Sequence, residues 1–157
     1  MLKLENKILD TFDIDLYQQE GFEITSCIIN KVKVAGCKFT QPVKISNCII
    51  TSFLAVGTWF EEGITIENST FLQETTFEAG GYNKPGAQVV LKNNIFHPFV
   101  NFFDCHYSGP FIFKNNLILN GSNLLGNTDT PIGIRFEKGN EISNNNGILN
   151  SDNIDFL

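Results

Sequence analysis

The chain has 157 residues, of which 42% are hydrophobic, and it carries a formal net charge of −6. This length fits one domain, and no apolar run approaches the roughly 20 residues that a membrane-spanning helix needs. An acidic balance argues against direct nucleic-acid binding, which requires cations to replace phosphate counterions. The first residues lack the basic region and long apolar core of a signal peptide, so a cytoplasmic location is expected.

A short phrase, apolar-x-apolar-x-Asn, returns along the chain at steps of 20 to 25 residues. Clear copies, one with Ser in place of Asn, begin at Leu2, Phe22, Val43, Ile64, Val89 and Phe111, and a looser seventh copy is expected near Ile134-x-Phe136. A period of this length predicts a solenoid in which each copy forms one coil. The expected fold is therefore all-β: a single-stranded parallel β-helix of about seven coils, each of about 20–22 residues.

A finer period of five residues lies within each copy. In the second copy, pairs of apolar or small residues follow one another: Phe22 and Ile24, Cys27 and Ile29, Val32 and Val34, Cys37 and Phe39. Residues two apart on a strand face the same side, so both members of each pair should point inward. A turn after every pair predicts four sides to each coil.

These pairs resemble the repeats of the pentapeptide-repeat family, which favour a small residue two places before a central Leu or Phe. The best matches, within a region of about residues 2–120, are Cys27-x-Ile29, Cys37-x-Phe39, Cys48-x-Ile50, Ser69-x-Phe71 and Thr75-x-Phe77. The resemblance implies a right-handed, four-sided β-helix. Known members of the family include DNA mimics that bind DNA gyrase through an acidic dimeric rod. The family's usual Asp or Asn before the central residue is mostly absent, and a wider, pectate-lyase-like β-helix is the structural alternative.

We expect one domain over residues 1–157, with coils in 1–138 and a C-terminal cap or tail in 139–157, where Asn becomes frequent. The segment Gly80–Gly86 inserts about four residues between two copies and is expected to bulge as a surface loop. The Asn of each phrase is expected at a corner of the coil, because Asn tolerates a left-handed backbone. In-register Asn side chains could then form a ladder.

Five acidic residues and no basic residue lie between positions 61 and 83: Glu61, Glu62, Glu67, Glu74 and Glu78. In a solenoid they would form an acidic band. Paired carboxylates could hydrolyse a glycoside, so a carbohydrate-active β-helix enzyme is one alternative, and an acidic DNA mimic that acts on an enzyme such as gyrase is another. Surface acids more often serve solvation, and the lysines between Lys31 and Lys44 interrupt the acidic surface.

The cysteines and histidines give weaker signals. No Cys-x-x-Cys motif occurs, so Cys27, Cys37, Cys48 and Cys105 are predicted to be reduced thiols in the core rather than metal ligands. His97 precedes a proline, and Cys105-x-Tyr107 looks like another inward pair, which leaves His106 outside. No metal site, catalytic residue or cofactor is predicted.

The outward positions carry the main functional signal. The residue between the members of the second pair in each copy should face outward, and these residues are Ile8, Ile28, Ile49, Thr70, Ile95 and Leu117. A continuous aliphatic stripe is more than monomers normally expose. We expect a non-enzymatic interaction module that uses Ile8, Ile28, Ile49, Ile95 and Leu117 to dock another protein or, favoured here, a second copy. A missing N-terminal segment, or the tail that begins at Ile148, could cover the stripe instead.

Overall fold

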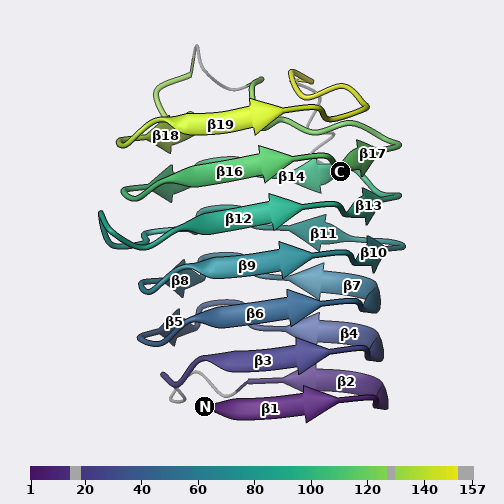
Figure 1. Ribbon diagram of the computed structural model, residues 1–157. Helices are drawn as coiled ribbons and strands as arrows, with labels where there is room; N and C mark the ends of the chain where they lie inside the picture. The colour runs from purple at the N-terminus through teal and green to yellow at the C-terminus, as the bar shows by residue number, and fades with distance from the viewer. Residues whose placement is uncertain (15–18, 127–129, 152–157) are drawn as a thin grey trace.

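The computed structural model describes residues 1–14, 19–126 and 130–151 (Figure 1). Within these residues the chain is all-β and contains no helix, and its parallel strands stack into a β-solenoid. The expected fold class is confirmed. Successive layers of the stack are called rungs below, and each strand of the first sheet begins one rung.

The first sheet runs along the front of the molecule in Figure 1 and contains seven parallel strands. In order they are β1 (Leu2–Glu5), β3 (Phe22–Thr25), β6 (Val43–Ser46), β9 (Ile64–Glu67), β12 (Val89–Lys92), β16 (Phe111–Lys114) and β19 (Asn140–Ser143). The first residues of the phrases pair in register, Leu2 with Phe22 and Val43 with Ile64. The repeat of the sequence is therefore the stacking repeat of the sheet.

The second sheet lies behind the first and has eight strands. They are β2 (Ile8–Asp13), β4 (Ile28–Lys33), β7 (Ile49–Leu54), β10 (Thr70–Phe71), β11 (Thr75–Thr76), β13 (Ile95–Phe96), β14 (Val100–Asn101) and β17 (Leu117–Ile118). The strand β7 pairs with both β10 and β11, because an extra residue in the rung of β10 and β11 interrupts the long strand seen in the earlier rungs.

The remaining side of the solenoid carries two short sheets, β5 (Lys38–Phe39) with β8 (Trp59–Phe60), and β15 (His106–Tyr107) with β18 (Arg135–Phe136). Isolated bridges at Gly81 connect Trp59 to His106. The seventh phrase was expected near Ile134-x-Phe136, and that position is wrong: this segment lies on this side. The seventh strand of the first sheet is β19, where Asn140 pairs with Phe111. A polar residue at this usually apolar place hid the repeat.

The core consists of the inward pairs that the five-residue period predicts. All four pairs of the second copy are buried, as are Phe12 and Ile14 of the first. Aromatic rings stack from rung to rung: Phe71 lies 4.9 Å from Phe96, and Phe77 lies 5.0 Å from Phe102, centroid to centroid. Repeated burial of large apolar side chains is the main stabilising term.

One corner of the solenoid has a left-handed backbone at every rung, as predicted. The residues there have φ between 52° and 57°: Asn6, Ser26, Asn47, Asn68, Asn93, Asn115 and Asn144. This conformation is costly for most residues but tolerated by Asn. Asn93 also donates a side-chain hydrogen bond to Asn68 at 3.3 Å, one step of the expected ladder.

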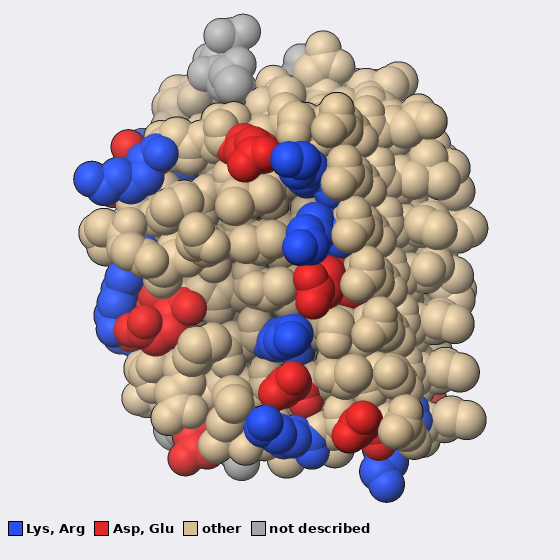
Figure 2. Space-filling model, viewed as in Figure 1, with Lys and Arg blue, Asp and Glu red and all other residues tan. Residues whose placement is uncertain are grey.

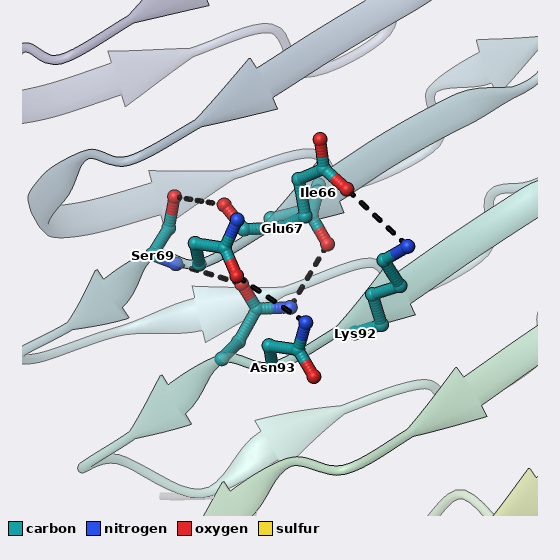
Figure 3. A network of polar contacts seen from close by, with 7 residues as sticks. Ile66, Glu67, Ser69, Lys92 and Asn93 are labelled. Carbon is teal, nitrogen blue, oxygen red and sulfur yellow. Dashed lines mark hydrogen bonds and ion pairs between the residues drawn. The ribbon is translucent and has the colours of Figure 1, made fainter.

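A second, buried ladder follows that corner and was not foreseen. Its members occupy the next position of each rung: Cys27, Cys48, Ser69, Asn94, Asn116 and Asn145. Each side chain accepts a hydrogen bond from the backbone N–H of the rung before. Asn94, for example, accepts from the Ser69 N–H at 3.0 Å and donates to the Ile66 carbonyl at 3.0 Å. Figure 3 labels these two partners, Ser69 and Ile66. The ladder provides acceptors for backbone N–H groups that lie at the corner and therefore have no partner within the sheets.

The Gly80–Gly86 insertion is only partly the surface loop that the sequence predicts. Lys84, Pro85 and Gly86 are exposed, but Asn83 is 1% exposed. Its amide donates to the Ala87 carbonyl at 2.6 Å and accepts from the Ser108 N–H at 3.1 Å. Asn83 therefore ties the loop to the next rung, because a buried amide must find hydrogen-bond partners.

Candidate interaction face

Six outward side chains form one column along the second sheet, which we call the aliphatic column. Its members are Ile8, Ile28, Ile49, Thr70, Ile95 and Leu117, and each is the Cα partner of the next. Ile8 is 82% exposed, Ile28 48%, Ile49 43% and Ile95 38%. The structure thus brings together the predicted residues in one continuous row.

The column itself contains no charged side chain. In Figure 2 the charged side chains gather on the centre and left of the molecule, whereas the right flank, where the chain turns from the first sheet to the second, is mostly uncharged. Further exposed apolar side chains, Leu72, Leu119 and Ile148, follow the second sheet or lie just beyond its last strand. Such a surface is energetically unfavourable in water unless something covers it.

The column ends in a polar residue. Leu117 bridges to Asn146, and the Ile118 N–H donates to the Asn146 carbonyl at 2.8 Å. The repeat therefore continues past residue 139, where the sequence predicts a cap or tail, and reaches Asn146 with the same corner at Asn144. The expected fold-back of the tail over the column rests partly on residues 152–157, which lie outside the described part of the chain.

The acidic band is largely balanced by lysines of neighbouring rungs. Glu61 lies 2.9 Å from Lys38, Glu67 lies 3.6 Å from Lys92, and Glu62 pairs with Lys84. Of the lysines between Lys31 and Lys44, Lys38 pairs with a member of the band, and the other two ion pairs use Lys84 and Lys92. A surface of alternating charge offers less of the continuous negative potential that imitation of DNA requires.

The band does not converge on a single cleft. Glu61 and Glu62 follow β8 on the short third side, whereas Glu74 and Glu78 flank β11 in the second sheet. Glu78 accepts a hydrogen bond from the Asn101 amide at 3.0 Å. Among the described residues, no three or more His, Cys, Asp and Glu side chains are grouped as a metal site.

The cysteines and His106 have structural surroundings rather than those of a reactive site. Cys105 and Tyr107 are both buried, and burial raises the pKa of the Cys105 thiol to about 12. Such a thiol is a poor nucleophile, because the thiolate is the reactive form. His106 faces outward, as predicted, and its Nε2 lies 2.6 Å from the Glu137 carboxylate, whose pKa is lowered by this hydrogen bond. All four cysteines are buried, and none forms a disulfide.

Sequence reasoning missed an outward aromatic stack on the third side. The rings of Trp59 and Tyr82 lie 4.8 Å apart, those of Tyr82 and His106 lie 5.4 Å apart, and the Lys38 ammonium lies 5.3 Å from the Trp59 ring. The rings are tilted against one another, by 31° and 50°, and Trp59 and Tyr82 are both exposed. Tyr82 lies within the insertion, where the five-residue period is interrupted, so the period could not predict which way its side chain points.

Comparison with known proteins adds no relative. No family model, curated protein or solved structure matches the chain. No helix of the described residues is long and apolar enough to cross a bilayer.

Proposed function

We propose that this chain is a non-catalytic interaction module of pentapeptide-repeat type, in which the aliphatic column docks a second copy of the chain. The observation that carries the proposal is the in-register row from Ile8 to Leu117, in which four isoleucines are exposed and Thr70 alone is not aliphatic. A row of this kind has no role in the core, because its members point away from it. The buried, unreactive cysteines favour a reducing, cytoplasmic setting.

The size of the face fits a weak homodimer. Six rungs spaced by ~4.8 Å and about five residues per side at ~3.3 Å give a face of roughly 24 by 17 Å. That is roughly 400 Å2, the size of the largest, often functional, apolar patch on typical proteins. It is about half of the ~800 Å2 per partner in a standard interface. We therefore propose association that depends on concentration over the micromolar range.

A second copy suits this face better than a strongly charged partner. Two chains of net charge −6 repel each other, and the repulsion is least where the facing surfaces carry few charges. Salt screens the repulsion, so association should strengthen from low to moderate ionic strength. A highly basic partner would show the opposite dependence.

Charge placed in the column should separate the subunits. We predict that the double variant Ile28→Glu with Ile49→Glu sediments as a monomer at concentrations where the unmodified chain forms a dimer, because both carboxylates would lose water on docking. The matched control is Lys44→Glu, an outward change on the first sheet, which should still dimerise. A monomeric unmodified chain at several hundred micromolar would contradict the proposal, as would a double variant that dimerises normally.

A further inference from the structure

Charged side chains follow the two edges of the aliphatic column, and they bear on how a second copy could be oriented. The first edge is formed by the last outward residues of the first sheet, which pair in register: Glu5, Thr25, Ser46, Glu67, Lys92 and Lys114. The other edge follows the bend of the second sheet, where Thr11 pairs with Lys31 and Lys31 with Ser52. Glu74 comes next, since Thr75 pairs with Phe53.

Three of these charged side chains have no ionic partner within the described part of the chain. Glu5, Lys31 and Glu74 form no salt bridge there, whereas Glu67 and Lys92 pair with each other at 3.6 Å. Lys31 and Glu74 lie on the same edge, with Ser52 between them. The separation of two rungs, ~10 Å, keeps them from pairing within one chain.

If the two solenoids are aligned, faces related by a two-fold axis can meet in two orientations. If the axis runs along the solenoid, the copies are parallel and each rung meets the same rung of the other copy, with opposite edges in contact. Glu67 then lies opposite Glu74, a like-charge contact that occurs twice. If the axis runs along the strands, the copies are antiparallel, and each edge of the column meets the same edge of the other copy.

We propose that two copies pack antiparallel with the two-fold axis at Ile49, a geometry that rests on the proposed function of the column. Ile49 then faces Ile49, Ile28 faces Thr70 and Ile8 faces Ile95. On the edges, Lys31 faces Glu74 of the second copy, and Glu5 faces Lys92. Each opposite-charge contact occurs twice, and no like charges meet. An axis one rung further along would instead place Glu67 on Glu67 and Glu74 on Glu74.

The geometry also explains the single polar break in the column. Thr70 has a methyl group and a hydroxyl group, so it can pack beside Ile28 while its hydroxyl reaches water at the interface. The edge pairs determine which rungs of the two copies face each other. They supply little of the affinity, because exposed ion pairs are individually weak. Apolar contacts of the five rungs from Ile8 to Ile95 supply the association.

Cross-linking distinguishes the orientations. With sheets ~10 Å apart and rungs ~4.8 Å apart, the two Ile49 positions lie ~10 Å apart in the antiparallel pair, the two Ile28 positions ~14 Å and the two Ile95 positions ~22 Å. Single variants Ile49→Cys, Ile28→Cys and Ile95→Cys are treated with a short bis-maleimide, with the unmodified chain and its buried cysteines as background. We expect covalent dimer chiefly from Ile49→Cys and none above background from Ile95→Cys.

Equal cross-linking of all three variants would establish the parallel pair and overturn the antiparallel one. A chain that dimerises in sedimentation but does not cross-link at Ile49→Cys also overturns this geometry, while the proposed function stands. A chain that remains monomeric overturns both.

Charge reversal gives a second, independent test. Lys31→Glu should weaken dimerisation about 2- to 30-fold, since it removes two edge pairs and creates like-charge contacts. Lys31→Glu combined with Glu74→Lys should restore it, because the pair is re-formed with its signs exchanged. If the double variant dimerises no better than Lys31→Glu alone, the two residues do not face each other.

Discussion

Replacing Phe71 with alanine is expected to lower the free energy of unfolding by about 3–5 kcal/mol. Phe71 is fully buried in a central rung, where it pairs with Ile50 below and Phe96 above. Its ring lies 4.9 Å from Phe96 and 5.9 Å from Phe53. The smaller side chain would leave a cavity that touches three rungs, and the rigid stack on either side limits how far it can collapse.

Chemical denaturation followed by circular dichroism measures this loss. The matched control is Leu72→Ala at the next residue, which is 42% exposed and should change stability by about 0.5 kcal/mol or less. Because rungs of a solenoid interact mainly with their neighbours, the Phe71→Ala chain should also unfold in two steps. An unchanged transition for Phe71→Ala would mean that the core register described above is wrong.

The second large effect is expected in the buried polar ladder. Asn94→Leu should cost about 1–3 kcal/mol, because it leaves the buried Ser69 N–H without its acceptor and removes a hydrogen bond to the Ile66 carbonyl. Asn94 is 1% exposed, so water cannot easily replace the lost amide.

Asn94→Ser is the matched control for this prediction. Serine occupies the same place at Ser69, where its hydroxyl accepts from the Cys48 N–H at 3.0 Å. The serine variant should therefore keep the contact to Ser69 and lose less stability than the leucine variant, as measured by the same denaturation experiment. If both variants lose equally, side-chain volume rather than hydrogen bonding stabilises this corner.

Much of this fold could be predicted from the sequence, because one short period sets both the sheet register and the orientation of side chains. The step from Phe22 to Val43 in the sequence is one rung in space, and Ile28 between two inward residues must face outward. The aliphatic column follows from that rule alone. The number of residues in the column and their exposure could be predicted without knowing which distant residues are in contact.

Other features depend on contacts that the period does not encode. Cys, Ser and Asn occupy equivalent positions in the buried ladder, and all three can accept a hydrogen bond. Because the residue types differ, the sequence does not show that these positions share a role. The last strand of the first sheet begins with Asn140 rather than an apolar residue, which misplaced the seventh repeat. Asn83 lies within an insertion, and only the fold shows that it reaches Ser108.

The central claim is that the aliphatic column is covered when the protein associates. Hydroxyl-radical footprinting of the unmodified chain at low and high concentration tests this most directly, because Ile49 and Trp59 are similarly exposed, at 43% and 41%, but lie on different sides of the solenoid. The account predicts that oxidation of the peptides with Ile28 and Ile49 falls several-fold at high concentration while Trp59 is oxidised equally at both. Unchanged oxidation of the column, or protection of Trp59 instead, would contradict it.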